Sequence, residues 1–408
     1  MKNNIWFNKR FLAYALGLSI DRFGNAVYSI VLPLLAYSMT KSFIDMGVMA
    51  ICQFFPRIIF GFFAGPLIDR AKKRNILFKA LIFQSFCSML IAILFQWSFL
   101  EMWMLYASGA LLSIGFEFSR TAEISVVPEM FEDKKVDAIT SLATIHTLMF
   151  IAGPTVGGLL LKFTSYGTLL WVNSLTYLGP IIFCCWSKIP NNRIIPKDKG
   201  LKTVLNDMKE GFQFLRKNFV LKKIMLITFF NGMATSGIQM MVLFYVKDYL
   251  KLNDSQTGLV LAVDGIGMLV GSIMVGRLKL MGRGPFLQIC LCLNLTGSLL
   301  FLWPSTESLL IGQFLISVGT FSYLVSMDVI IQSLTPGHML GRMAGLFRLF
   351  NYLIFVSSTA CRSFFVSKIG IVNIFALSSF LILMAVVLAK TYFFGGQIKD
   401  SDFNFEKA

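Results

Sequence analysis

The sequence predicts an all-α membrane protein with twelve transmembrane helices, and three observations lead to this fold class. The chain of 408 residues is 56% apolar and only 14% charged, whereas a soluble protein carries roughly a quarter charged residues. That leaves too little polar surface to cover a soluble globule. The apolar residues gather in about twelve runs, each long enough to cross a bilayer as a helix. The basic residues fall in short blocks between these runs.

The apolar runs define the expected helices in chain order. The basic segment 1–10 precedes an apolar run that is too long for a cleaved signal peptide, so we take that run as the first transmembrane helix. The twelve runs lie near 11–37, 43–68, 76–97, 102–125, 137–161, 168–187, 222–246, 256–280, 285–303, 308–333, 342–365 and 370–393.

The distribution of Lys and Arg predicts the orientation. With the N-terminus inside, about twenty-eight Lys and Arg lie on the cytoplasmic side and about six outside, as the positive-inside bias requires. We therefore expect a multi-pass membrane protein with both termini in the cytoplasm. The net charge of +16 does not indicate nucleic-acid binding, because the basic residues do not share one surface.

A polar, Lys-rich stretch near the middle of the chain indicates two halves. Its apolar residues recur at helical spacing, so we expect an amphipathic helix on the inner membrane surface, with a basic face that favours anionic lipid. We interpret the stretch as a linker and prefer this to a regulatory segment. The predicted organisation is a six-helix bundle (1–187), a cytoplasmic linker (188–222), a second six-helix bundle (223–393) and a cytoplasmic tail (394–408).

Residues 65–74 end the second apolar run with a small-residue turn, one carboxylate and four basic side chains. This segment resembles the loop between the second and third helices of the major facilitator superfamily, written G-x-L-a-D-R-x-G-R-K. Lys72 stands where the family has a second glycine. The resemblance implies the major facilitator fold and a gating motif. The matching residues are Gly65, Leu67, Asp69, Arg70, Lys73 and Arg74.

Two further segments narrow the resemblance. Gly153, Pro154, Gly157 and Gly158 in the fifth run resemble the G-P-x-x-G-G core of a motif common in drug–proton antiporters. Segment 329–342 resembles the start of helix 11 in a bacterial branch that holds macrolide-efflux-like and siderophore-export-like transporters. The basic residue that this family usually carries in helix 4 is absent, because Leu112 occupies its place.

Ionisable residues inside the predicted spans are candidates for function, since they are costly in a bilayer. Asp21 and Arg57 both lie roughly 15 Å or more from a helix end at 1.5 Å per residue, so they could meet across a cavity. Glu117 and Arg120 are three residues apart and can pair. The candidates for proton coupling or substrate contact are Asp21, Arg57, Glu117, Asp264 and Asp328.

Several ionisable residues of the predicted spans have a simpler interpretation than proton coupling or substrate contact. Asp328, Arg120 and Glu123 are expected to reach the interface by snorkelling. A lone His146 in the fifth run is more often a packing residue. Asp21 and Asp264 have no local partner in the sequence and lie deeper, so they are the preferred candidates.

The resemblance implies secondary active transport by alternating access, in which two halves rock about a central cavity. It also implies that Asp69 locks the cytoplasmic side, and a helix that starts near Arg342 would favour such an anion at its N-terminus. We expect proton-coupled efflux of drug-like or amphipathic small molecules by a monomer in the lipid bilayer.

Two alternatives stay open: an exporter of a specific metabolite such as a siderophore or peptide, and a non-transporting receptor or scaffold. The sequence does not indicate an enzyme, since it shows no nucleotide-binding loop, nucleophile motif or metal-ligand cluster. No cofactor is expected, because the proton gradient would supply the energy.

Overall fold

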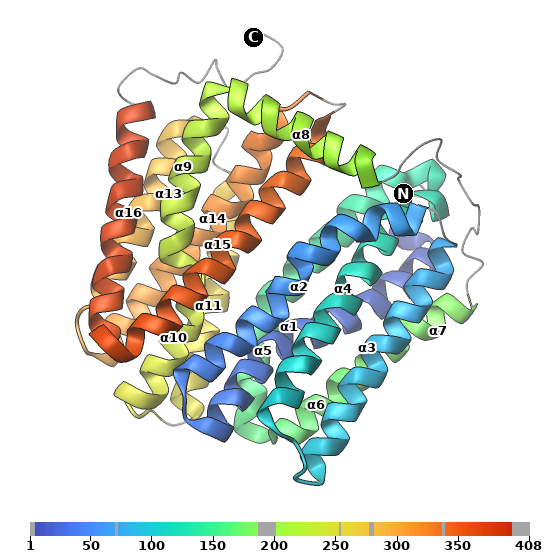
Figure 1. Ribbon diagram of the computed structural model, residues 1–408, viewed down its shortest axis with the longest axis horizontal. Helices are drawn as coiled ribbons and strands as arrows, with labels where there is room; N and C mark the ends of the chain where they lie inside the picture. The colour runs from blue at the N-terminus through green and yellow to red at the C-terminus, as the bar shows by residue number, and fades with distance from the viewer. Residues whose placement is uncertain are drawn as a thin grey trace. The chain divides into compact units, whose positions relative to one another are not determined.

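The computed structural model describes residues 5–69, 72–186, 201–252, 254–276, 281–336 and 339–393. Within these ranges all regular elements are helices (Figure 1), as the sequence predicts. The chain divides into two compact units, Met1–Val204 and Leu205–Ala408. Residues 187–200, where the predicted linker begins, and the predicted tail 394–408 lie outside the described residues.

The first unit holds six spans. The sixth is interrupted at Tyr177, where α6 ends and α7 begins. Its elements are η1 (Ile5–Phe7), α1 (Lys9–Thr40), α2 (Phe43–Asp69), α3 (Lys73–Gln96), α4 (Met102–Met130), η2 (Glu132–Lys134), α5 (Lys135–Phe163), α6 (Tyr166–Thr176) and α7 (Leu178–Trp186).

The amphipathic helix α8 leads into the second unit, which also holds six spans. Its first span is interrupted after α9, at Ser236 and Gly237. Its elements are α8 (Leu201–Lys217), α9 (Phe219–Thr235), α10 (Ile238–Phe244), the π-helical turn η3 (Tyr245–Tyr249), α11 (Asp254–Val275), α13 (Arg283–Leu300), α14 (Thr306–Leu334), α15 (Leu340–Ile369) and α16 (Ile371–Phe393).

The described helices make twelve spans when α6–α7 and α9–α10–η3 each count as one. Nine of these are long and apolar enough by composition alone to cross a membrane, and α4, α5 and α13 complete the set. Large apolar side chains such as Phe163 and Ile273 are exposed. In a membrane protein such residues face lipid, so this exposure agrees with the predicted fold class.

Polar side chains set several helix starts. Asn8 accepts hydrogen bonds from the backbone N–H groups of Arg10 and Phe11 at the start of α1. Asn218 accepts one from Leu221 at the start of α9, and Ser305 one from Ser308 at the start of α14. Each bond satisfies an N–H that has no partner within the helix.

Small residues allow close helix packing within each unit. Gly153 of α5 lies against Ala26 of α1, and a Cβ built on Gly153 would fall 2.2 Å from the Ala26 Cβ. In the second unit, Gly297 of α13 faces Gly312 of α14, where a Cβ would fall 2.6 Å from a backbone oxygen. Close backbone approach is typical of membrane helix pairs, which gain little from hydrophobic burial against lipid.

The linker helix α8 packs on the start of α15. Gly211 faces the backbone and Cβ of Arg342, and Glu210 forms an ion pair with the Arg342 guanidinium. Leu215 is buried in the core of the second unit, while Phe212 is exposed. The expected amphipathic helix is therefore present. Leu215 anchors it in the second unit, and the apolar side chain of Phe212 faces outward.

Candidate functional site

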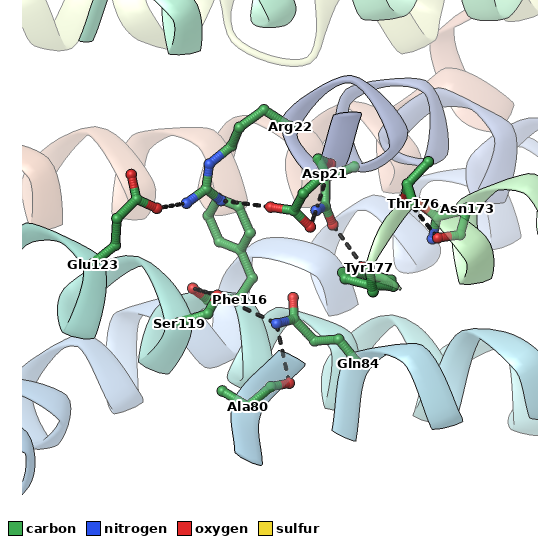
Figure 2. A network of polar contacts seen from close by, with 11 residues as sticks. Asp21, Arg22, Ala80, Gln84, Phe116, Ser119, Glu123, Asn173, Thr176 and Tyr177 are labelled. Carbon is green, nitrogen blue, oxygen red and sulfur yellow. Dashed lines mark hydrogen bonds and ion pairs between the residues drawn. The ribbon is translucent and has the colours of Figure 1, made fainter. Parts of the chain in front are cut away.

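Arg22 is the centre of a buried ionic cluster in the first unit. Its guanidinium forms an ion pair with Glu123 of α4, and its Nη1 lies 3.6 Å from the Asp21 Oδ2 (Figure 2). Asp21 and Arg22 are only 3% and 6% exposed. Adjacent residues project from different faces of a helix, so Arg22 needs a partner other than its neighbour Asp21, and Glu123 supplies it. However, the side chain also reaches Asp21.

Asp21 has local partners, contrary to the sequence expectation. The Asn25 amide donates to the Asp21 Oδ1 at 2.9 Å, because the two side chains are one helical turn apart on α1. The Tyr177 hydroxyl donates to the Asn25 Oδ1 at 2.8 Å. Tyr177 lies where α6 gives way to α7, so the interruption of the sixth span carries a residue into the network (Figure 2).

The cluster holds two carboxylates and one guanidinium. With all three ionised it carries one net negative charge in a buried position, and uptake of one proton makes it neutral. Buried charges are stable only when they are paired. The cluster can therefore exist in two protonation states with different internal ion pairs, and such a pair of states can be coupled to a conformational change.

Phe116 of α4 connects the cluster to a second cation. The Arg22 guanidinium carbon lies 5.1 Å from the centre of its ring and the Arg57 guanidinium carbon 4.5 Å. Arg57 also lies over Phe54, and its Nε donates to the Ser113 hydroxyl at 3.3 Å. Among the described residues no carboxylate pairs with Arg57. The expected meeting of Asp21 and Arg57 is thus not seen, since the ring of Phe116 links Arg57 to Arg22 instead.

Glu117 of α4 is buried and unpaired in the part of the chain that is described. It is 3% exposed, and its Oε2 has no hydrogen-bond partner. The expected pairing with Arg120 does not form, although the two residues are three apart on the helix. A Cβ built on Gly61 of α2 would lie 3.4 Å from the Glu117 Oε1. Gly61 therefore leaves space for this carboxyl one helical turn from Arg57.

The two candidates in the second unit differ in environment. Asp264 of α11 is 4% exposed, accepts hydrogen bonds from Gln239 and Gln313, and contacts the Ser317 hydroxyl. Asp328 of α14 is exposed, in line with the interpretation that it reaches the interface. His146 of α5 is half-buried. Among the residues that the structure describes, no group of His, Cys, Asp and Glu is arranged to hold a metal ion.

Sequence reasoning missed Arg362, a buried cation on α15 that is 5% exposed. Its guanidinium donates to the backbone carbonyls of Met233, at 3.1 Å, and Ala234, which lie in the last turn of α9. These carbonyls have no partner within the helix, and a helix C-terminus favours a cation. Arg362 thus stabilises the interruption between α9 and α10.

Glu123 and Tyr177 were not among the predicted site residues either. The signal for Arg362 is the one used for Asp21, an ionisable residue inside an apolar run. Glu123 lies three helical positions from Arg120 near the end of its run, which favoured an interfacial interpretation. The signal for Tyr177 was Pro180, which cannot donate to the carbonyl of Thr176 and so marks the end of α6 beside Tyr177.

The gating motif is described only in part. The Lys73 ammonium pairs with Glu129 at the end of α4, and Arg74 donates to the backbone oxygen of Cys184 in the last turn of α7 at 2.8 and 3.1 Å. Both contacts join segments of the first unit. Arg70 and the side chain of Asp69 lie outside what the structure describes, as does the burial of Gly65. The latch between Asp69 and the start of α15 therefore stays a prediction.

The antiporter-like motif lies at the contact between α1 and α5. Gly153 and Gly157 face Ala26 and Val27 of α1, immediately after Asn25 of the polar network. The backbone of Pro154 and Gly158 is helical, and the Pro154 side chain lies outside the described part. The glycines of the motif therefore set how closely α5 approaches the helix that carries Asp21 and Arg22.

We expect Gly153→Ala to lower the free energy of unfolding by about 1–3 kcal/mol, the usual cost of overpacking. The new methyl would fall 2.2 Å from the Ala26 Cβ and 3.1 Å from its backbone. Thermal unfolding of the purified protein measures the effect. The matched control is Gly345→Ala, where nothing lies within 4 Å of the added Cβ. An equal midpoint for both variants would contradict the packing role.

Solved structures of transporters share this fold. The structure resembles the nucleoside transporter NupG, with a TM-score of 0.73 at 12% identity, over 96% of this chain and 100% of that one. It also resembles a bacterial homologue of the iron transporter ferroportin in an inward-facing state, with a TM-score of 0.67 at 16% identity, over 95% and 99%. These likenesses establish the fold. The protein is a multi-pass membrane transporter of the major facilitator superfamily.

The family follows from the sequence profile. Residues 14–401 match the family described as transmembrane secretion effector, and the chain belongs to this family. The predicted relation to macrolide-efflux-like transporters is confirmed. Macrolide efflux protein A of Streptococcus pyogenes is 20% identical over 278 residues, 67% of this chain and 68% of that protein.

Two other relatives are efflux or resistance proteins by name. The chloramphenicol resistance protein CraA of Acinetobacter baumannii is 24% identical over 273 residues, 62% of this chain and 61% of that protein. The multi-drug resistance efflux pump PmrA of Streptococcus pneumoniae is 23% identical over 253 residues, 59% of each chain.

Proposed function

We propose that this protein is a proton-coupled exporter of drug-like or amphipathic small molecules that works by alternating access. The observation that carries the proposal is the buried cluster of Asp21, Arg22 and Glu123, which can take up one proton and become neutral. The family and the efflux proteins among its relatives support export as the direction of transport.

The coupling would proceed within the first unit. A proton that neutralises Asp21 or Glu123 weakens its attraction to Arg22, so the guanidinium keeps a single anionic partner. Because Asp21 and Glu123 lie on different helices, such a change alters the contact between α1 and α4. Substrate would then leave in exchange for the proton. We further propose that the protein acts as a monomer, with both termini in the cytoplasm and without a cofactor.

We expect Asp21→Asn to abolish proton-driven uptake of a macrolide or chloramphenicol into inverted membrane vesicles, while the protein still inserts. Asparagine keeps the size of the side chain but cannot take up the proton, so only exchange driven by the substrate gradient should persist. The matched control is Glu307→Gln, which neutralises an exposed acid in the first turn of α14 and should transport normally. Proton-driven uptake at the wild-type rate in Asp21→Asn would remove Asp21 from the coupling step.

A second candidate function is export of a specific anionic metabolite, such as a siderophore or peptide. It is favoured by Arg57, a half-buried cation that is held by two aromatic rings and one hydroxyl and pairs with no described carboxylate. An anionic group of a substrate would supply the missing partner. The test is a growth and uptake screen of toxic drugs and of siderophores in cells with and without the gene. Protection against neutral or cationic drugs supports the first function, and dependence on an anionic compound supports the second.

A further inference from the structure

Asp264 lies in a buried site of the second unit that contains only neutral hydrogen-bond donors. The Gln239 amide of α10 donates to its Oδ2 at 2.9 Å, and the Gln313 amide of α14 donates to its Oδ1 at 2.7 Å. The Ser317 hydroxyl of α14 also contacts the Oδ1. Three helices thus contribute to a polar site around a carboxyl that is 4% exposed.

No cation balances this carboxyl within the described part of the chain. Asp264 forms no ion pair there, and the described side chains that hydrogen-bond to it, Gln239, Gln313 and Ser317, are all neutral. The acids of α14, Glu307 and Asp328, do not contact it. An ionised carboxylate in such surroundings would be a buried charge without a counter-charge, which is costly in a bilayer. A neutral, protonated carboxyl avoids this cost.

The hydrogen count at Ser317 points to the same state. Its Oγ lies within hydrogen-bond distance of two acceptors, the Asp264 Oδ1 and the backbone oxygen of Gln313 at 2.7 Å. A hydroxyl has one hydrogen, so with an ionised Asp264 one of the two contacts lacks a proton. When Asp264 is protonated, its O–H donates to the Ser317 Oγ, and Ser317 donates to the Gln313 backbone. Both contacts are then satisfied.

We propose that Asp264, Ser317, Gln313 and Gln239 form a proton-binding site in the second unit, and that Asp264 is protonated in the conformation described. A proton from solution binds the Asp264 Oδ1, and its release leaves the carboxylate with three neutral donors. Proton binding at Asp264 does not depend on the proposed function. Only the step that the bound proton would drive rests on the proposed proton-coupled transport. It gives the second unit an ion site of its own, separate from the cluster around Arg22.

The competing occupant is a monovalent metal ion such as Na⁺. The Oε1 of Gln313 is buried without a partner, and with the Asp264 and Ser317 oxygens it adds a possible ligand. The hydrogen bonds that join the Gln313 amide N–H group and the Ser317 hydroxyl to Asp264 favour the proton, since a metal ion would have to break them to bind the carboxyl oxygen they share. The experiment therefore includes sodium as a variable.

The test is infrared difference spectroscopy of the full-length protein in lipid nanodiscs, in H₂O and D₂O. We expect the wild type at pH 7 to contain a C=O stretching component of a protonated carboxylic acid that shifts in D₂O and is missing in Asp264→Asn. Protonated carboxyls of the first unit would be present in both proteins, so the wild-type-minus-variant difference spectrum isolates Asp264. The matched control Asp328→Asn removes an exposed acid of the neighbouring helix and should keep the component. A wild-type-minus-Asp264→Asn difference spectrum at pH 7 without this component overturns the proposal.

A second series replaces choline chloride with sodium chloride at constant pH and ionic strength. We expect the band of Asp264 to keep its intensity, because a proton occupies the site. Loss of the band with sodium assigns the site to the metal ion and overturns the proposal. Neither measurement requires a transported drug. A failure of the proposed drug efflux would therefore leave this result intact, and the reverse also holds.

Discussion

Arg22→Met is expected to lower the free energy of unfolding by about 3–5 kcal/mol, the usual effect of removing one partner from a buried ionic group. The substitution leaves Asp21 and Glu123 without their shared cation, while the methionine keeps most of the side-chain volume. It also removes the cation from one side of the Phe116 ring. Transport should be lost as well, since the two carboxylates can no longer compete for one guanidinium.

Thermal or denaturant unfolding of the purified protein measures this effect, and a second substitution tests its cause. Adding Glu123→Gln to Arg22→Met removes one of the two uncompensated charges, so the double variant should be more stable than Arg22→Met alone. Arg22→Lys keeps the charge but loses the two-sided geometry of the guanidinium, and it should lie between wild type and Arg22→Met. A double variant that is no more stable than the single one would contradict the ionic explanation.

The twelve spans were predictable from the sequence, because hydrophobic length and the spacing of basic blocks are local properties. The ends of the helices were less so. For example, α1 extends to Thr40 and closes with Lys41 in a left-handed conformation, which no hydropathy pattern reports. The breaks at Tyr177 and Gly237 also escaped prediction, although each has a local cause. Pro180 cannot donate a hydrogen bond to the carbonyl of Thr176, where α6 ends, and Ser236 and Gly237 form a small-residue pair at the end of α9.

The buried carboxylates of the candidate sites were predictable from the sequence, but most of their hydrogen-bond partners were not. Asp21 and Asp264 were chosen for their depth, and both are buried. However, their partners Asn25, Gln313 and Ser317 are neutral residues that are common in membrane helices, so no sequence signal marked them. A similar limit applies to Glu117. Its position three residues from Arg120 suggested an ion pair that does not form, because helical spacing makes such a contact possible without requiring it.

The buried Arg362 guanidinium is bound by backbone carbonyl oxygens and not by a carboxylate. The carbonyls of Met233 and Ala234 end α9 at a break near the middle of its span, where no water replaces the missing hydrogen bonds. The break itself needs Gly237, which has a φ of 73° and leaves no room for a side chain beside Thr359. Arg362 of α15 and Gly237 of the interrupted span thus stabilise the same helix break.

We therefore expect Arg362→Met to lower the free energy of unfolding by about 2–3 kcal/mol, since it leaves the Ala234 carbonyl without its donor and the Met233 carbonyl with Ser358 as its only side-chain donor. The comparison variant is Ser358→Ala, which keeps the Arg362 cation and removes a neutral hydroxyl. This hydroxyl contacts the backbone oxygens of Met233 and Ser236 at 2.8 and 2.9 Å and accepts a hydrogen bond from the Arg362 Nε at 3.1 Å. The substitution should cost about 1 kcal/mol, because it removes neutral hydrogen-bonding capacity and leaves the guanidinium on both carbonyls. Unfolding of both purified variants compares the two. If Arg362→Met were as stable as Ser358→Ala, the cation would not be what holds the break. The interruption of the span would then be stabilised by the packing of Gly237 against Thr359 alone.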